Sequence, residues 1–381
     1  MPDGVRARYR GVGMQMAVKT REACHVFKDI CRIKLPASPP SAYGKVLAQA
    51  ILTRYHENLR AEERHCCMDL VFGSGSLLAI IVGAYLAKRA GLFGPKDYRV
   101  LQTMIFNVTL PAAAVRAFAS SEHDLNLMWV TAFGFIAASV PLFVIYALTR
   151  GQSTSSRAFQ MFNAATFNIG SFALPTVITL LGPIAGVTVI MFDLGNVVMC
   201  AVGSQIVTTS LLHLKGNPIE GDTLGQKIHG VARRFYSSFI FDVYLVLFVL
   251  LATGATVPSP ILTVIDPLAS ANTFLSMAMV GMMMEIPASR EDFLDFARVV
   301  GWRLGAAIVL ALCALFLLPV PADVRMVAAI TVFAPIPLFA CKFTDESLDR
   351  GKLAGFSLTA SAMLSLLIMA ALCLVLPAFL G

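Results

Sequence analysis

Polar and helix-breaking residues interrupt a strongly apolar stretch of the chain between residues 162 and 182. The stretch reads FNAATFNIGSFALPTVITLLG and contains Asn168, Gly170 and Pro175. A membrane helix must satisfy its own backbone polar groups, so such an interruption at depth is tolerated only beside a cavity lined by protein. These residues therefore predict a helix that breaks near the bilayer midplane. The second half-helix would then present free N–H groups, which attract anions.

A second interruption occurs far along the chain, where Pro335 and Pro337 stand in the sequence AITVFAPIPLFACKF. Interruptions at corresponding positions in two halves of a transporter indicate a binding site, although prolines also kink ordinary helices. With a rise of about 1.5 Å per residue, Asn168 and Pro335 both fall near the centre of a membrane crossing. This matched depth favours the binding site.

Other polar residues are predicted at mid-depth. Asp193 and Asn196 are three residues apart and share a helical face. A carboxylate within a membrane helix is costly and is a functional candidate, but a structural hydrogen bond to a neighbouring helix explains it equally well. Asparagines can donate to an anion without the cost of burying a cation. The predicted substrate-binding residues are Asn107, Asn168, Gly170, Pro175, Asn196, Pro335 and Pro337, with Asp193 for proton or ion coupling.

The composition identifies the class of protein. The 381 residues are 57% hydrophobic and 14% charged, whereas an average soluble domain is roughly a quarter charged. The mean hydropathy is +0.74, which indicates an all-α polytopic membrane protein. The formal charge of +7 does not indicate nucleic-acid binding, because the basic residues lie in short loops that orient membrane proteins.

The apolar segments predict ten transmembrane helices, given about 20 residues for each crossing. Five segments precede a polar loop and five follow it, so the second half enters the membrane from the opposite side. This predicts two inverted five-helix repeats, residues 68–211 and 238–381, joined by a cytoplasmic linker, residues 212–237. The segments are Leu70–Ala87, Val100–Ala119, Leu125–Thr149, Ala158–Leu181, Ile184–Leu211, Ser238–Ala255, Ile261–Met284, Val299–Leu318, Met326–Phe343 and Leu353–Leu376.

Residues 1–67 differ from the rest of the chain. They are polar and basic, and such a segment is expected to be largely disordered. The basic loops place both ends of the ten-helix unit outside, where a basic extension conflicts with the positive-inside rule. Met68 is therefore favoured as the natural start, with translocation of a long polar segment as the alternative.

Several motifs resemble one known family. The sequence NIGSFALP, residues 168–175, resembles the Asn-x-Gly-x-x-Gly-x-Pro pattern in the fourth helix of the auxin efflux carrier family, which includes bacterial malate and malonate permeases. GAYLAKRAGLF, NVTLPAAAV and AITVFAPIPL extend the resemblance over residues 68–381, although Ala173 replaces the second glycine and Phe241–Asp242 stands where Asn-Pro is common. The resemblance implies two inverted repeats whose helices 4 and 9 cross at the midplane as broken helices.

The residues and the resemblance together predict a secondary active transporter. It would carry an organic anion, a dicarboxylate or an auxin-like carboxylate, across the cell (inner) membrane by alternating access; a sodium-coupled symporter of the bile-acid type is the alternative. The expected partners are the anion, the lipid bilayer, a coupling proton or sodium ion and, among assemblies, a homodimer, but no nucleic acid.

Catalysis is not expected. The chain has no HExxH, GxSxG or P-loop pattern, and no CxxC spacing indicates a metal, so no enzyme activity, cofactor or metal is predicted. Arg303, placed about one turn into the eighth segment, is interpreted as an interfacial anchor, with neutralisation of an anion in the inner vestibule as the alternative.

Overall fold

The computed structural model describes residues 68, 71–120, 125–214, 239–285 and 290–380. The chain divides into two units, residues 1–72 and 73–381, and the fold below is that of the second unit. The predictions for residues 1–67, and most of the predicted linker, lie outside the described residues.

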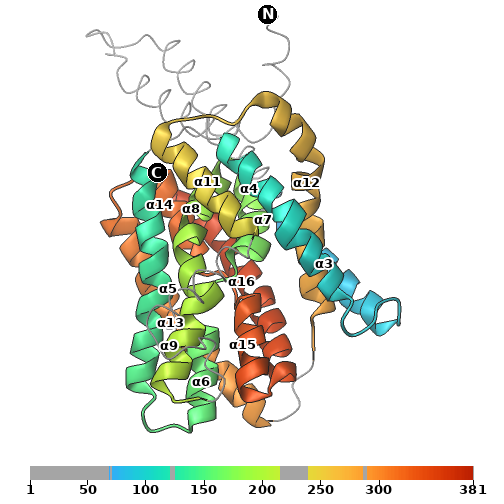
Figure 1. Cartoon of the computed structure of the whole chain (residues 1–381), viewed down its shortest axis with the longest axis vertical. Helices are drawn as coiled ribbons and strands as arrows, with labels where there is room; N and C mark the ends of the chain where they lie inside the picture. The colour runs from blue at the N-terminus through green and yellow to red at the C-terminus, as the bar shows by residue number, and fades with distance from the viewer. Residues whose placement is uncertain (1–67, 69–70, 121–124, 215–238, 286–289, 381) are drawn as a thin grey trace, which may run out of the picture. The chain divides into compact units, whose positions relative to one another are not determined.

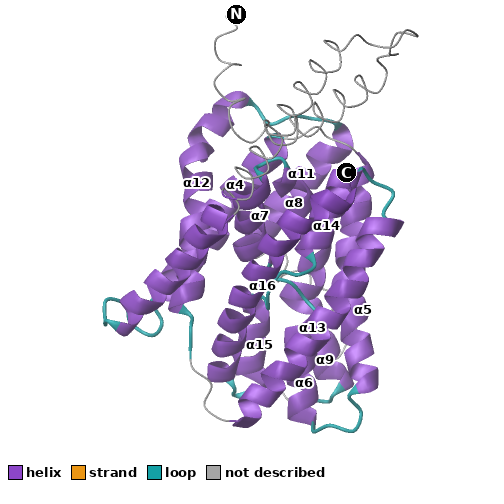
Figure 2. Cartoon of the chain, turned by 180° about the vertical axis from the view of Figure 1, so that it is seen from behind, coloured by secondary structure: helices purple, strands orange, loops and turns teal. Residues whose placement is uncertain are grey.

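Every described element is a helix (Figure 2), which confirms the all-α class. The helices in the first part of the chain are Val71–Arg89, α3 (Tyr98–Met104), α4 (Leu110–Ala119), α5 (Met128–Leu148), α6 (Thr154–Ala164), α7 (Leu174–Leu181), α8 (Ala185–Val198) and α9 (Ser204–Leu211). Those in the second part are α11 (Phe239–Thr253), α12 (Ser259–Met282), α13 (Arg290–Leu317), α14 (Ala322–Thr331), α15 (Leu338–Leu348) and α16 (Gly351–Leu380).

Wide π-helical turns join several of these helices. They comprise Ile105–Thr109 between α3 and α4, Ile169–Ala173 before α7, and Met199–Gly203 between α8 and α9. Two of the turns are followed closely by a proline, Pro111 or Pro175. Because proline has no N–H to donate to the preceding turn, the wider turn lets the helix continue past it.

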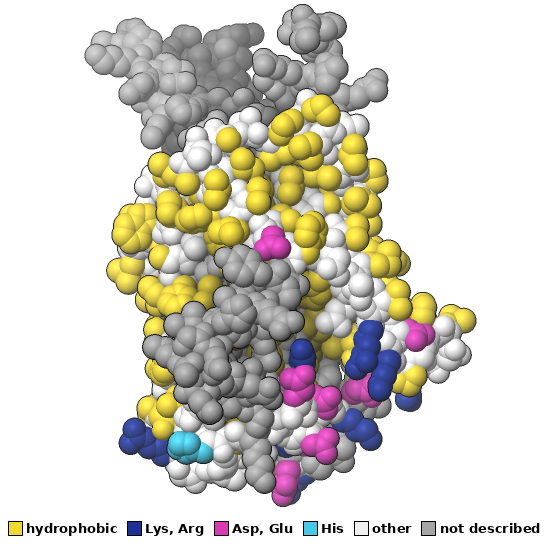
Figure 3. All heavy atoms as spheres, in the orientation of Figure 1, with side chains coloured by type: hydrophobic (Ala, Val, Ile, Leu, Met, Phe, Trp, Pro, Cys, Tyr) yellow, Lys and Arg dark blue, Asp and Glu magenta, His cyan; other side chains and the backbone are white. Residues whose placement is uncertain are grey.

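Seven helices are long and apolar enough to cross a membrane, and the bent pair Thr154–Ala164 and Ile169–Leu181 makes an eighth. The protein is therefore a multi-pass membrane protein. The remaining two of the ten predicted segments form shorter helices: α11 has 15 residues, and α14 and α15 have 10 and 11. Large apolar side chains such as Phe72, Val264 and Phe316 are exposed, and hydrophobic side chains cover much of the surface seen in Figure 3, as lipid contact requires.

We divide the helices of this unit into two groups (Figure 1), which also contact each other where α4 and α11 pack against α8. The flanking helices are residues 71–89, α3, α4, α11 and α12. Among them α4 packs against α11 and α12, and Thr109 donates a 3.0 Å hydrogen bond to Asn272 of α12. The central helices are α5–α9 and α13–α16. The closest packing among them joins α5 to α8, where an added Cβ on Gly134 or Gly195 would overlap the partner backbone.

Ion pairs join the central helices near one end. Arg350, between α15 and α16, binds Asp292 and Asp295 of α13 at 2.8 Å each, and Ser156 of α6 donates to Asp295 at 2.7 Å. Burial alone would lower the pKa of Arg350, but hydrogen bonds to the two carboxylates raise it above its ordinary value. The guanidinium therefore stays charged, and this cluster joins α6 and α13 to the turn between α15 and α16.

Candidate functional site

The first predicted break lies between α6 and α7. The helix ends at Ala164 and resumes at Ile169, and the two arms differ in direction by 50°. Asn168 has the non-helical angles φ −83° and ψ 81°. The break therefore lies before Gly170 and Pro175. Pro175 stands at the start of the second arm, where the π-helical turn before it accommodates the missing N–H of the proline.

The second break lies between α14 and α15, and it meets the first. Residues 332–337 are not helical, and Pro337 is the extended residue that precedes α15. The N–H of Asn168 donates to the carbonyl of Pro335 at 2.9 Å. Figure 2 shows these non-helical segments inside the bundle rather than at the ends of the helices. The two interruptions, which are 167 residues apart in the chain, are thus in direct contact. We name the place where they meet the crossing, and define it as residues 165–168 and 332–337.

The side chain of Asn196 on α8 forms hydrogen bonds with the backbone of the first break. Its Oδ1 accepts from the N–H of Phe167 at 3.1 Å, and its Nδ2 donates to the carbonyl of Phe167 at 3.0 Å. The side chain replaces the backbone partners that the break removes. Ser361 of α16 acts similarly at the second break, where its Oγ accepts from the N–H of Ile336 at 3.1 Å. Asn196 therefore binds the protein's own backbone, and sequence reasoning did not identify Ser361.

Asp193 is buried one helical turn from Asn196 and accepts hydrogen bonds from two side chains and from the backbone N–H of Gly170. The Nδ2 of Asn196 donates to one carboxylate oxygen at 3.0 Å, and the hydroxyl of Tyr244 donates to the other at 2.8 Å. Tyr244 lies on α11, so this second bond connects a central helix to a flanking helix. Among the described residues, no lysine or arginine forms an ion pair with Asp193. The structural hydrogen bond to a neighbouring helix, one of the two interpretations, is present.

Asn168 supplies a donor at the crossing that the protein does not use. Its Oδ1 accepts from the hydroxyl of Ser171 at 2.5 Å, but its Nδ2 is buried and has no acceptor. An unpaired buried donor costs about 1–3 kcal/mol, which an incoming acceptor would recover. Buried unpaired hydroxyls also occur on Ser276 of α12 and Ser357 of α16, two helices that pack together beside the crossing.

Two other predicted binding residues, Gly170 and Asn107, contact different parts of the protein. A Cβ built on Gly170 would lie 2.7 Å from a methyl carbon of Leu110 and 3.4 Å from Asp193, so glycine is required there for close packing. Asn107 is exposed on the π-helical turn 105–109 and donates to the carbonyl of Thr103 at 2.8 Å. Within the described residues, no hydrogen bond joins Asn107 to the crossing, although the ring of its neighbour Phe106 lies 6.3 Å from that of Phe339 on α15.

Arg303 of α13 reaches both breaks, and the interpretation of it as an interfacial anchor is wrong. Its Nη1 donates to the carbonyls of Asn163 and Thr166 at 3.0 and 2.7 Å, and its Nη2 donates to the carbonyl of Ala334. The guanidinium also lies over the ring of Phe167, 5.3 Å from its centroid. The residue lies midway along Arg290–Leu317, whereas the predicted segment began only at Val299, which misplaced it near a helix end.

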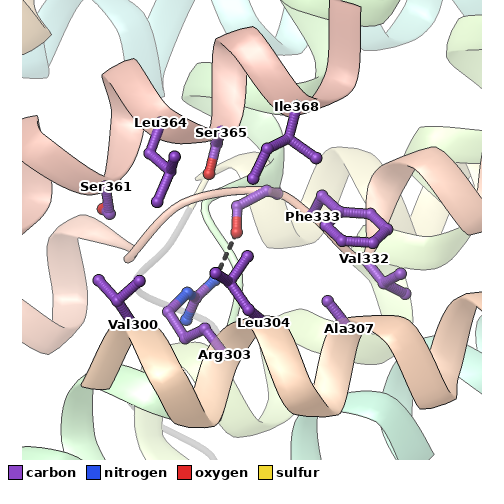
Figure 4. Close-up of a pocket in the computed structure, with 11 residues that line it drawn as sticks. Val300, Arg303, Leu304, Ala307, Val332, Phe333, Ser361, Leu364, Ser365 and Ile368 are labelled. Atoms are coloured by element: carbon purple, nitrogen blue, oxygen red, sulfur yellow. Dashed lines mark hydrogen bonds between the residues drawn. The ribbon is translucent and has the colours of Figure 1, made fainter. Parts of the chain in front are cut away.

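A small cavity adjoins this arginine (Figure 4). It is lined by apolar residues of α13 and α16 together with the hydroxyl-bearing residues Ser361 and Ser365. Figure 4 also shows the bond from Arg303 to the backbone of the second break. No group of three or more His, Cys, Asp or Glu that could hold a metal occurs among the described residues.

Comparison with known proteins agrees with this geometry. Residues 76–227, which include the first break and Asn196, match a family model described as membrane transport protein. No curated protein matches the chain.

Proposed function

We propose that the chain is a secondary active carrier of an organic anion, because residues 76–227 match the model of the membrane transport protein family, the family of the auxin efflux carriers. A family of transporters implies a transported substrate and argues against enzyme activity. The observation that carries the proposal is the contact of two helix breaks through Asn168 and Pro335, beside an unused amide donor. The proposed location is the cell (inner) membrane.

The charge at the crossing favours an anion. The arms that begin at Ile169 and Leu338 direct their N-termini toward the breaks, and each helix N-terminus carries roughly half a positive charge. The Nδ2 of Asn168 adds a neutral donor. A carboxylate forms strong, charge-assisted hydrogen bonds with such N–H groups. A dicarboxylate or an auxin-like carboxylate is therefore the proposed substrate class.

Two inverted five-helix repeats are part of the proposal. In each half, an N–H in the break donates to a side chain on the last helix of the same half: Phe167 to Asn196 of α8, and Ile336 to Ser361 of α16. Both bonds measure 3.1 Å. The equivalence supports ten crossings, with the α6–α7 and α14–α15 pairs as broken helices 4 and 9.

Alternating access would move the central helices against the flanking helices. Hydrogen bonds between the groups include Tyr244 to Asp193 at 2.8 Å and Thr359 to the carbonyl of Val280 at 3.5 Å. The ion pairs of Arg350 lie within the central group. Sliding of one group along the other would break these two bonds and leave the ion pairs intact.

Purified protein in liposomes tests the proposed function. We expect uptake of at least one of malate, malonate, citrate and indole-acetate when a proton or sodium gradient is imposed. Uptake that requires sodium and fails with a proton gradient alone would favour the bile-acid-type alternative. Failure to transport any of these anions in either gradient would contradict the proposal.

Pro335→Ala is expected to slow turnover more than it weakens binding. The proline keeps residues 332–337 out of a helix, and the break would serve as a hinge during alternating access. We expect kcat for uptake to fall about tenfold while KM changes less than about twofold, a difference of roughly 1.4 kcal/mol in the barrier alone. Pro141→Ala, at a proline inside the unbroken helix α5, is the control. Equal rates for wild type and Pro335→Ala would indicate a passive kink.

Asp193→Asn is expected to abolish gradient-driven accumulation and to preserve exchange of substrate for substrate. An asparagine can still accept from Tyr244, but it cannot bind and release a coupling proton or cation. Tyr244→Phe removes the same 2.8 Å bond and keeps the carboxylate, so accumulation should persist in this control. Accumulation by Asp193→Asn at the wild-type level would exclude Asp193 as the coupling residue.

A further inference from the structure

We infer that Arg303 is a positioning residue that neutralises the negative ends of two half-helices and thereby sets the affinity of the crossing for an anion, without touching that anion. The inference rests on the proposed function and deepens it. It assigns to α13 a part in substrate recognition that neither the sequence motifs nor the family match provides.

The carbonyl ends of the broken helices converge on this side chain. The last carbonyls of a helix lack acceptor partners within the helix and together carry roughly half a negative charge. Helix α6 ends at Ala164, and carbonyls on both sides of that end, those of Asn163 and Thr166, accept from Arg303. The carbonyl of Ala334, three residues beyond the end of α14, accepts from its other terminal nitrogen.

No other lysine or arginine in the described part of the chain donates to both breaks. The side chain is partly buried, and the cavity beside it carries the hydroxyls of Ser361 and Ser365 (Figure 4). Polar groups of this kind lower the cost of a charge at the centre of a membrane helix. The charge is thus kept at mid-depth rather than at the surface.

The charges at the crossing then add up in favour of an anion. Two C-terminal ends contribute about −0.5 each and one guanidinium contributes +1, so these cancel, and the two N-terminal ends of about +0.5 each remain. The buried carboxylate of Asp193, which accepts from the N–H of Gly170, offsets this remainder when it is ionised and leaves it unchanged when it binds a proton. In either case, removal of the guanidinium lowers the sum by one unit charge, so the site would attract an anion less strongly. Three of the five N–H groups of Arg303 already donate to backbone carbonyls, so the inference assigns the bound substrate to the N-terminal ends and not to Arg303 itself.

The test measures KM and kcat for uptake of labelled malonate and indole-acetate by the full chain in liposomes. Arg303→Gln should raise KM about tenfold, the factor that corresponds to roughly 1.4 kcal/mol, with a smaller change in kcat. Arg303→Lys keeps the charge and should leave KM within about twofold of wild type, while kcat falls because an ammonium cannot hold the same three carbonyls. Arg157→Gln is the matched control: Arg157 also binds a carbonyl, that of Tyr146 at 3.0 Å, and lies over that ring at 5.0 Å, but it is remote from the breaks.

A wild-type KM in Arg303→Gln with reduced kcat or reduced folded yield would overturn the inference, because Arg303 would then be only a structural clamp. Equal increases of KM in Arg303→Gln and Arg303→Lys would overturn it as well. If Arg303→Gln does not fold, Arg303→His replaces it, since a histidine titrates near pH 6.5. Its KM relative to wild type should be lower at pH 5 than at pH 8, and an unchanged ratio would contradict the inference.

Wild-type protein that transports neither probe would overturn the proposed function, and the inference with it. That result appears before any variant is compared, so the two failures are distinguishable.

Discussion

Asn168→Ala is expected to reduce uptake of the organic anion strongly and to leave the protein folded in the membrane. The substitution removes the unpaired Nδ2 donor at the crossing but keeps the backbone N–H that binds Pro335. A hydrogen bond to a charged group contributes about 1.5–3 kcal/mol, so affinity should fall by roughly 10- to 100-fold and uptake near the wild-type KM by about 5- to 50-fold. Initial rates of uptake into liposomes at a substrate concentration near the wild-type KM provide the measurement.

Asn107→Ala is the matched control for this prediction. Asn107 also lies at a helical irregularity near mid-depth, but its side chain is exposed and donates to its own helix. Uptake by Asn107→Ala should stay within about twofold of wild type, because loss of a solvated hydrogen bond costs little. Normal uptake by Asn168→Ala, or its loss in Asn107→Ala, would place the binding site elsewhere.

Asn196→Ala is expected to destabilise the protein and to abolish transport together. It leaves the buried N–H of Phe167 without its partner, leaves the carbonyl of Phe167 with only a weak 3.9 Å hydrogen bond from the thiol of Cys200, and removes a donor to Asp193. Each unsatisfied buried group costs about 1–3 kcal/mol, so the free energy of unfolding should fall by roughly 2–5 kcal/mol. Thermal unfolding in detergent and uptake in liposomes would be measured on the same preparation.

Ser361→Ala provides a graded comparison, since it removes only the one acceptor of the N–H of Ile336. Its melting temperature should lie between those of wild type and Asn196→Ala. A melting temperature of Asn196→Ala equal to that of wild type would show that the bonds to Phe167 do not hold the break.

The breaks could be predicted from the sequence because glycine and proline act locally. Pro335 and Pro337 fall inside the non-helical residues 332–337, and Gly170 follows the end of the first break. The apolar segments likewise located the helices, since about 20 apolar residues are needed for each crossing. The charged residues at the start of α13 were left out of the predicted segment: the helix begins at Arg290, whereas the predicted segment begins at Val299.

The partners of the breaks could not be predicted, because they depend on tertiary packing. Tyr244 and Ser361 are single polar residues in apolar helices, and nothing in their spacing indicates Asp193 or Ile336 as their partners. The exposed position of Asn107 could not be predicted for a different reason. The π-helical turn 105–109 adds a residue to the turn and changes the face on which the side chain lies, and a single sequence gives little warning of such turns.

Substrate-induced thermal stabilisation of the purified protein tests the central claim most directly. A ligand at 100 times its Kd stabilises the folded state by about 2.7 kcal/mol. With the anion that the wild type transports, at about 100 times the wild-type Kd, we expect the melting temperatures of wild type and Asn107→Ala to rise equally. That of Asn168→Ala should rise at most about half as much, because its affinity is roughly 10- to 100-fold lower. An equal rise in Asn168→Ala would contradict an anion site at the crossing.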